Sequence, residues 1–405
     1  MKADKIESIP GGTVTSPEGF FAGAAAAGIK KVAGALDLGI LYSQVLCPTA
    51  GVFTTVNIKS ASVTRSQVNL KEGKAQALVA NSGCANAYTG AKGLADAEAM
   101  AAMAAETLGI SSGDVLVAST GVTGQLLPME KIERGVRQIA LSRDGGHDFA
   151  RAIMTTDTVP KKAGVSVNSG SARFTIGGVA KGSGMIHPNM ATMLCFLTTD
   201  AAVELDFLRA ALQKSVALSL NMISVDGDTS PSDTVLLMAN GLAGNEPIAA
   251  GSQQAETFQQ ALDRICVQLA KALARDGEGA TRLIEATVRG AASLAEARMA
   301  ARTIISSSLV KTAVNGGDPN WGRIVAAVAR SGAEATLAKM DVSIGRTDVL
   351  KAGEPLDFDE SRVIEDLKLD EVPIKVNLNL GSASATAWGC DMSEEYVRIN
   401  GQYMT

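Results

Sequence analysis

The sequence predicts an α/β protein built from two layered domains. A chain of 405 residues exceeds what a single hydrophobic core usually supports, so two domains are expected. Strand-like and helix-like patterns occur in both halves of the chain. In the second half a strand pattern leads directly into a helix pattern, an order typical of layered α/β domains.

The first half contains one alanine-rich helix pattern and two clear strand patterns. Residues 93–109 (GLADAEAMAAMAAETLG) predict the helix, whereas residues 115–119 (VLVAS) and 173–180 (RFTIGGVA) predict the strands. A third strand is predicted over residues 193–197, directly after a glycine-containing loop.

The clearest helix of the chain is predicted between residues 255 and 273. Its apolar residues recur at intervals of three or four and form one stripe, which consists of Phe258, Leu262, Ile265, Leu269 and Leu273. A strand over residues 281–288 and a helix over residues 293–310 follow. Residues 374–388 alternate apolar and polar side chains around a glycine turn, which predicts a hairpin.

Composition and charge are those of a globular protein with no sign of a nucleic-acid or membrane partner. Hydrophobic residues make up 46% and charged residues 20% of the chain, as in ordinary globular domains. The net charge of −5 and the absence of a Lys/Arg block argue against nucleic acid or an anionic membrane as the main partner. The first residues, MKADKIESIPGG, carry charges where a signal peptide has its apolar core. We therefore expect a cytoplasmic protein.

Cysteine and histidine usage disfavours two common kinds of site. The five cysteines are widely spaced and odd in number, which predicts reduced thiols and neither a disulfide framework nor a CxxC metal site. The only two histidines, His147 and His187, are far apart in sequence, so a His-rich metal site or a Ser-His-Asp triad is poorly supported. The scarcity of histidine favours a nucleophile that carries its own base.

Thr192 is the candidate for such a nucleophile. It lies between the glycine-containing loop KGSGMIHPNMA and an apolar strand, so its hydroxyl is placed to attack the preceding carbonyl, that of Ala191. The acyl group would then move from nitrogen to oxygen, and hydrolysis of the ester would leave Thr192 as a new N-terminus. Its α-amine, with a reference pKa of about 7.7 to 8.0, can act as general base for its own hydroxyl. The residues alone favour the plainer interpretation that Thr192 simply starts a buried strand.

A series of motifs changes this interpretation. The segment KGSGMIHPNMATML resembles the self-cleaving segment of the glutamate N-acetyltransferase family of arginine biosynthesis, also called ornithine acetyltransferase. Further blocks similar to those of the family occur in the same order and span nearly the whole chain: PGGTVTSPEGF, NSGCANAYTG, ASTGVTG, VDGDTS, RDGEGATRLIE, VNGGDPNWGRI and RINGQYMT. The resemblance implies two α/β domains in which helices enclose packed sheets.

The resemblance also implies cleavage between Ala191 and Thr192. The first chain, residues 1–191, would form most of the N-terminal domain, and the second, residues 192–405, most of the C-terminal domain. Two copies of each chain are expected to form a heterotetramer. Neither chain should be stable alone, because strands on both sides of the cut would share sheets.

Candidate site residues follow from motifs that match the family. Thr120 and Gly121 form a turn after the predicted strand 115–119, where a hydroxyl and a backbone N–H can stabilise an oxyanion. Without the resemblance this segment is only a turn. Lys181 suits a substrate carboxylate and can lower the pKa of a nearby amine, and Glu278 suits a substrate ammonium.

Three further positions match substrate-binding positions of the family: Thr155, Asn400 and Thr405. The chain ends in Tyr-Met-Thr, whereas family members commonly end in a doubled threonine or serine, so Thr405 departs from the pattern. The block DGDTSPSD also departs from it, with Pro-Ser where an asparagine often precedes the last Asp, and it is not included in the site. Its first two aspartates are interpreted as a polar supporting turn and not as a metal site.

The implied activity is transfer of an acetyl group from N2-acetyl-L-ornithine to L-glutamate through an acetyl-threonine intermediate. No cofactor is expected, although some family members also accept acetyl-CoA. Residues 182–184 (GSG) are no nucleotide fingerprint, because the third glycine and the strand-to-helix context are missing. Two alternatives share the cleavage: an aminopeptidase or amidase that passes the acyl group to water, and a non-catalytic binding protein in which the cut is only a maturation step.

Overall fold

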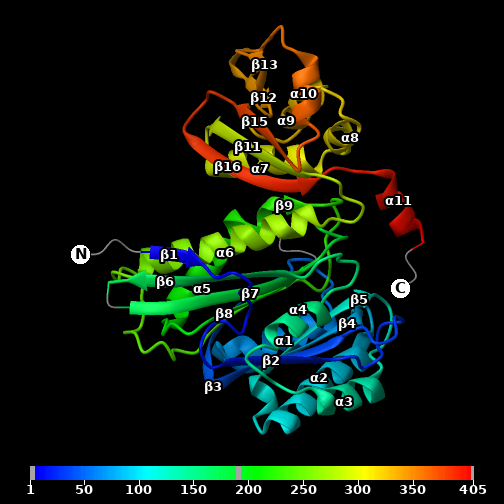
Figure 1. Cartoon of the computed structure of the whole chain (residues 1–405), viewed down its shortest axis with the longest axis vertical. Helices are drawn as coiled ribbons and strands as arrows, with labels where there is room; N and C mark the ends of the chain where they lie inside the picture. Colours follow the sequence, from blue (N-terminus) through cyan, green and yellow to red (C-terminus); the bar gives the residue numbers. More distant parts are fainter. Residues whose placement is uncertain (1–4, 171, 188–192, 403–405) are drawn as a thin grey trace.

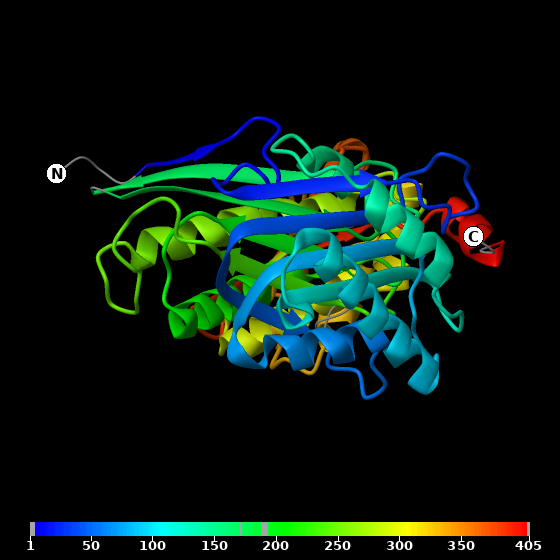
Figure 2. The same ribbon diagram turned by 90° about the horizontal axis from the view of Figure 1, so that it is seen from below.

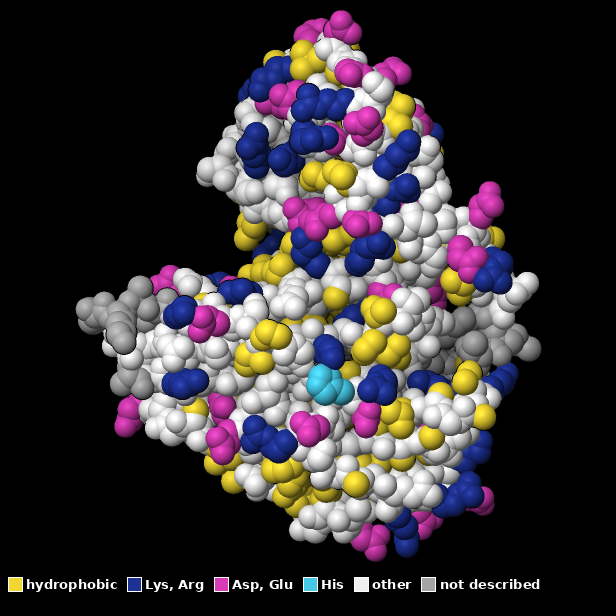
Figure 3. Space-filling view, viewed as in Figure 1, with side chains coloured by type: hydrophobic (Ala, Val, Ile, Leu, Met, Phe, Trp, Pro, Cys, Tyr) yellow, Lys and Arg dark blue, Asp and Glu magenta, His cyan; other side chains and the backbone are white. Residues whose placement is uncertain are grey.

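The computed structural model describes residues 5–170, 172–187 and 193–402, and it contains two β-sheets covered by helices (Figure 1). This arrangement confirms the predicted α/β class with sheets flanked by helices. The second sheet and its helices form a unit that an indentation sets off from the rest of the molecule on one side (Figure 3). Lys and Arg side chains are interspersed with Asp and Glu over the visible face.

The first sheet has nine strands in the described residues. Eight of them lie in the order β1-β6-β7-β8-β10-β3-β4-β5, and β2 pairs with β3. Their bounds are Lys5–Ser8 (β1), Phe20–Ala25 (β2), Leu38–Phe53 (β3), Lys74–Cys84 (β4), Val115–Val122 (β5), Lys161–Ser169 (β6), Ala172–Lys181 (β7), Leu194–Thr199 (β8) and Thr234–Ala239 (β10). The strands predicted at 115–119, 173–180 and 193–197 are confirmed as β5, β7 and β8.

This sheet folds over on itself at the long strand β3. The register of β3 with β4 shifts between Tyr42 and Cys47, and beyond that point β3 pairs with β10 instead of β2. One apolar core joins the inner faces of the two parts and contains Leu78 of β4, Leu116 of β5 and Phe196 of β8. The two parts therefore pack face to face, as in a β-sandwich, which brings the end of β5 close to the end of β7.

Helices cover the two outer faces of this sandwich. The outer face of β3, β4 and β5 packs against α2 and α3, the layer seen in front of the strands in Figure 2. The helix predicted over 93–109 is confirmed as α2. The opposite outer face packs against α6. The bounds are Ala61–Asn69 (α1), Gly90–Leu108 (α2), Met129–Gln138 (α3), Gly146–Ala152 (α4), Leu205–Leu218 (α5) and Ala255–Arg275 (α6).

Helix α6 confirms the predicted apolar stripe and joins the two units. All five stripe residues have no exposed surface. The helix contacts β6 and β7 of the first sheet and β16 of the second sheet, so it is buried on more than one side. A helix packed between two layers needs a wide apolar surface. The position of α6 therefore explains the clear apolar periodicity of its sequence.

Within the described ranges, the second sheet has seven strands in the order β14-β13-β12-β15-β11-β16-β9. The bounds of these strands and of the remaining helices are Ile223–Ser224 (β9), Leu283–Ala291 (β11), Asp341–Ile344 (β12), Thr347–Lys351 (β13), Glu354–Pro355 (β14), Glu371–Asn377 (β15), Ala383–Cys390 (β16), Leu294–Ser306 (α7), Ser308–Gly316 (α8), Gly322–Ala329 (α9), Glu360–Asp366 (α10) and Glu394–Gly401 (α11). The strand predicted at 281–288 is confirmed as β11.

Two predictions for the second half were wrong in detail. The segment 374–388 contains two strands, but β15 and β16 do not form a hairpin, because β11 lies between them and pairs with both. The single helix predicted over 293–310 is two helices. Ser307 is extended, with ψ of 113°, and its side chain accepts the Val310 N–H at 3.5 Å, so α7 ends there and α8 begins.

The segment after residue 192 contributes two central strands to the first sheet. Strand β8 pairs antiparallel with β7, and β10 pairs parallel with β8 and antiparallel with β3. Two strands from after the expected cut, β8 and β10, thus lie side by side between β7 and β3, which precede it. Residues 188–192, which include Ala191 and Thr192, lie outside the described residues.

All five cysteines are free thiols with buried side chains. Among the helices of the described residues, none combines the length and the apolar character that crossing a bilayer requires.

Candidate active site

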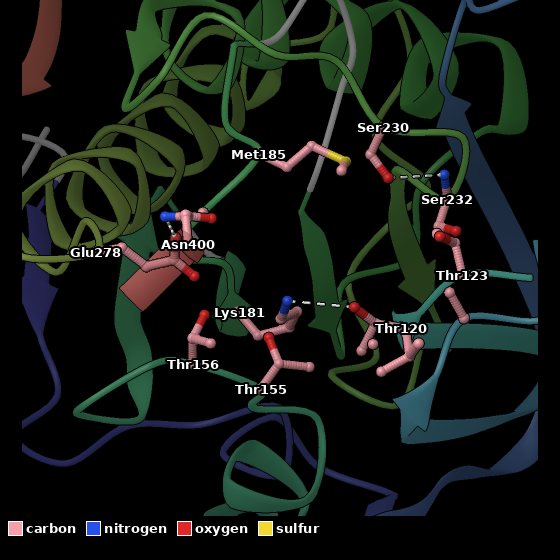
Figure 4. Close-up of a pocket in the computed structure, with 14 residues that line it drawn as sticks. Thr120, Thr123, Thr155, Thr156, Lys181, Met185, Ser230, Ser232, Glu278 and Asn400 are labelled. Carbon is pink, nitrogen blue, oxygen red and sulfur yellow. Dashed lines mark hydrogen bonds between the residues drawn. The ribbon is translucent and has the colours of Figure 1, made fainter. Parts of the chain in front are cut away.

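One cavity of about 330 Å³ brings together most of the predicted site residues. It opens between the two layers of the sandwich, where β5 and β7 end (Figure 4). The predicted residues that line it are Thr120, Gly121, Thr155, Lys181, Glu278 and Asn400. Of the other predicted residues, Ala191, Thr192 and Thr405 lie outside the described part of the chain.

The turn of Thr120 and Gly121 belongs to the last residues of β5. Gly121 has φ of 122°, a conformation that residues with a side chain rarely adopt. A Cβ atom at this position would also lie 2.5 Å from the carbonyl carbon of Gly83 in the neighbouring strand β4. The close approach of the two strands therefore requires glycine at position 121, and it fixes the direction in which the backbone of the turn faces.

Lys181 is the last residue of β7, and its ammonium group points to Thr120 (Figure 4). Its Nζ donates a hydrogen bond of 3.2 Å to Thr120 Oγ1. Because an ammonium group has only donors, the Thr120 oxygen is the acceptor, and the hydroxyl keeps its own proton for donation to another group. Burial lowers the pKa of Lys181, the nearby negative charge of Asp157 opposes this, and Lys161 lowers the pKa further.

The sheet register places this lysine beside the start of β8. Lys181 is opposite Leu194 in the antiparallel pair of β7 and β8. The expected nucleophile, Thr192, precedes Leu194 by two residues in the sequence and lies outside the described residues.

A buried ion-pair network holds backbone segments at the edge of the cavity. The carboxylates of Asp157 and Asp276 both pair with the ammonium of Lys161, and all three side chains are at most 8% exposed. Asp157 also accepts the backbone N–H groups of Thr155 at 2.9 Å and of Gly182 at 2.7 Å. Burial opposes ionisation of Asp157, but Lys181, Lys161 and the Gly182 N–H outweigh it and lower the pKa to about 2.

Glu278 carries the negative charge on the opposite side of the cavity. Its Oε2 accepts a hydrogen bond of 2.8 Å from Asn400 Nδ2, and its backbone N–H donates to the Ser183 carbonyl at 2.9 Å. Helix α11 lies apart from the other helices of the second unit (Figure 1), and its residue Asn400 lines the cavity. The last turn of α11 therefore reaches the site, and Glu278 lies opposite Thr120 with Lys181 between them (Figure 4).

The glycine loop after Lys181 is anchored by an aspartate from DGDTSPSD, the block that was left out of the predicted site. Asp226 accepts the backbone N–H of Ile186 at 2.9 Å and also that of Met185. Burial raises the pKa of Asp226, and these N–H groups oppose the increase. In the part of the chain that the structure describes, no group of three or more His, Cys, Asp or Glu side chains could hold a metal ion.

Sequence reasoning missed several residues that line the cavity: Val122, Thr123, Thr156, Met185, Ser230 and Ser232. Ser230 and Ser232 belong to the block DGDTSPSD. This block was left out of the predicted site because it departs from the family pattern. The sequence did contain an indication that these serines belong to the site, because the polar run directly precedes the buried strand β10.

Comparison with known proteins decides the family. The model of the ArgJ family matches residues 21–405. The chain belongs to the ArgJ family. It is 52% identical to the arginine biosynthesis bifunctional protein ArgJ of Dehalococcoides mccartyi over 99% of both chains. It is 51% identical to the protein of the same name from Symbiobacterium thermophilum, over 99% of this chain and all of the relative.

A solved structure of ArgJ from Bacillus halodurans is similar to part of this chain. The sequence identity is 46% and the TM-score is 0.50, and the match covers 51% of this chain and 97% of the solved chain. That solved chain thus corresponds to about half of the ArgJ sequence described here.

Proposed function

We propose that this ArgJ-family enzyme of arginine biosynthesis transfers the acetyl group of N2-acetyl-L-ornithine to L-glutamate. The observation that carries the proposal is one cavity with a cation, an anion and a turn suited to an oxyanion. Lys181 and Glu278 suit the carboxylate and the ammonium of an amino-acid substrate. Thr155 and Asn400 would supply further polar contacts along the cavity wall.

The nucleophile in this proposal is Thr192, freed by autoproteolysis of the bond after Ala191. The neutral α-amine takes the proton of the Thr192 hydroxyl, and the hydroxyl oxygen attacks the acetyl carbonyl carbon. The Thr120 hydroxyl and the Gly121 N–H stabilise the negative charge on the carbonyl oxygen. Lys181 supports this role, because its bond to Thr120 leaves the hydroxyl proton free for donation.

Breakdown of the tetrahedral intermediate completes the first half-reaction. The bond between the acetyl carbon and the ornithine nitrogen breaks, and that nitrogen takes the proton held by the α-amine. Ornithine leaves an acetyl-threonine on the enzyme. The amine of glutamate then attacks the acetyl carbon, which gives N-acetylglutamate and restores the Thr192 hydroxyl. Acetyl-CoA would enter as an alternative acetyl donor, and the reaction requires no cofactor.

Two copies of each cut chain are proposed to assemble as a heterotetramer in the cytoplasm. The match of the Bacillus halodurans chain to about half of this sequence supports division into two chains. The pairing of β8 with β7 and of β10 with β3 would hold the two chains together, because their separation would break these hydrogen bonds of the sheet.

Intact-mass spectrometry before and after incubation with N-acetylornithine tests the proposal. Two chains, with an acetyl adduct only on the chain that begins at Thr192, are the expected result. Thr192→Ser should retain some turnover, and Thr192→Ala should give one uncut, inactive chain. Release of acetate without transfer to glutamate would instead identify an amidase or aminopeptidase, and activity in Thr192→Ala would refute the nucleophile.

A further inference from the structure

Asp157 binds two separate stretches of the cavity wall through one carboxylate. Its Oδ2 accepts the backbone N–H of Thr155 at 2.9 Å, and its Oδ1 accepts that of Gly182 at 2.7 Å. Thr155 belongs to the segment after α4, whereas Gly182 directly follows β7. Both Thr155 and Lys181, the residue before Gly182, line the cavity. A single buried side chain therefore holds the two stretches at a fixed distance from each other.

The bond to Gly182 lies where strand β7 ends and the chain turns away from the sheet. Gly182 has φ of 150°, a conformation that residues with a side chain rarely adopt. Lys181 is the last residue of β7, and its ammonium donates to Thr120 Oγ1 at 3.2 Å. Asp157 thus acts on the pair of Lys181 and Thr120 through the backbone of the next residue in the chain.

Asp157 also supplies negative charge to a buried ammonium group. Lys181 is 4% exposed, and burial lowers its pKa. Among the groups that raise this pKa, Asp157 has the largest effect. Two further carboxylates raise the pKa of Lys181, one ammonium group lowers it, and a second ammonium group interacts with it: Asp233 directly before β10, Glu278, Lys161 and Lys30.

We infer that Asp157 is a positioning residue for the proposed acetyl transfer, which holds Thr155 and the end of β7 in place and acts as the counter-charge of Lys181. This inference rests on the proposed function. Asp157 is not among the described residues that line the cavity, so it would act through Thr155 and Lys181 and not on the substrate itself. A displacement of about 1 Å in such contacts can lower a rate on the order of 10²-fold.

Asp276 provides a matched comparison within the same ion-pair network. Like Asp157, it is buried and pairs with Lys161. Its carboxylate accepts the Thr158 N–H at 3.0 Å instead of the two N–H groups at the cavity wall. The largest effects on the pKa of Lys181 do not include Asp276. Replacement of either aspartate by asparagine therefore removes one charge from the same network, but only one replacement affects the cavity wall.

Asp157→Asn tests the inference through the pH dependence of kcat/KM for N-acetylornithine in the cleaved enzyme. At the optimum pH, kcat/KM should fall on the order of 10²-fold. The decrease of kcat/KM at high pH should begin about one unit lower, because loss of a negative neighbour lowers the pKa of Lys181. The ammonium of the substrate titrates equally for every variant, so a difference between variants belongs to the enzyme.

Two further variants separate the effects of charge and of position. Asp276→Asn should leave the decrease at high pH where the wild-type enzyme has it, even if the variant is less stable. Asp157→Glu restores the charge but displaces the carboxylate oxygens. It should therefore keep the wild-type decrease at high pH and still have a low kcat/KM. This variant retains a partner for Lys161, so it also tests the inference if Asp157→Asn does not fold.

Three results would overturn the inference. They are an unchanged pH profile in Asp157→Asn, an equal shift of the profile in Asp276→Asn, and a wild-type kcat/KM in Asp157→Glu. Absence of acetyl transfer by the wild-type enzyme would refute the proposed function instead.

Discussion

The hydroxyl of Thr120 and the ammonium of Lys181 are joined by a hydrogen bond of 3.2 Å between the ends of two strands that belong to opposite layers of the sandwich. The bond depends on the folding-over of the first sheet at β3, because β5 and β7 would otherwise lie on distant parts of the same sheet. The chemistry proposed for the cavity therefore depends on the packing of the sandwich as much as on any single side chain.

Thr120→Ala should lower kcat for acetyl transfer about 10²- to 10³-fold, which corresponds to the loss of one oxyanion donor. Thr120→Ser retains the hydroxyl and should recover most of this loss. Steady-state kinetics with N-acetylornithine and glutamate measure both variants. Equal activity of the alanine and wild-type enzymes would exclude the hydroxyl from the reaction.

Glu278→Gln should raise KM for N-acetylornithine about 10- to 100-fold, because a hydrogen bond to a charged group typically contributes about 1.5–3 kcal/mol. The substitution keeps an oxygen that can accept the Asn400 side chain. Glu133→Gln, an exposed residue paired with Arg137 on α3, serves as the control and should not change KM. A KM that stays at the wild-type value in Glu278→Gln would place the substrate ammonium elsewhere.

Gly184→Ala should disturb the same carboxylate sterically. A Cβ atom at position 184 would overlap the carboxylate group of Glu278, so the loop or the glutamate must move. We expect a loss of activity together with a higher KM. Gly316→Ala, where a Cβ meets no atom within 4 Å, is the control and should leave both activity and KM unchanged. If Gly184→Ala and Gly316→Ala had the same activity and KM, displacement of Glu278 would have no effect on the reaction.

Asp157 should make the fold sensitive to acid. Its pKa is about 2 in the folded protein and about 3.9 when unfolded, so the charged form stabilises the fold above pH 4. The contribution, on the order of 2 kcal/mol, is lost as the pH falls from about 4 to about 2. Asp157→Asn in the uncut Thr192→Ala background should show a lower free energy of unfolding at pH 6 and a smaller decrease below pH 4. Urea unfolding at several pH values measures this, and parallel curves for the two proteins would contradict it.

Local sequence patterns predicted well which segments form helices and strands. They predicted less well which of these elements lie next to one another in space. The stripe along α6 was readable because each turn repeats the same apolar face. The pairing of β15 and β16 was misjudged because β11, from about 90 residues earlier, inserts between them. The break at Ser307 was missed because a single serine cap interrupts two helices of similar apolar character.

The site was predictable where motifs matched the family, and it was missed where they did not. Lys181 and Glu278 are distant in sequence, and only the resemblance placed them at one substrate. Asp233 was excluded because two residues before it depart from the pattern, although an aspartate directly before a wholly buried strand is itself unusual. Its burial can be seen only in three dimensions.

The proposed cut would also affect how the enzyme recovers from denaturation, because β8 and β10, which follow the cut, lie between β7 and β3, which precede it. An uncut chain can refold in a unimolecular reaction, whereas two cut chains must first encounter each other before the central strands of the first sheet can pair. Refolding of the cleaved protein would therefore be second order, and its yield would depend on protein concentration. Maturation would make the fold practically irreversible in a dilute solution, even though every native contact is preserved.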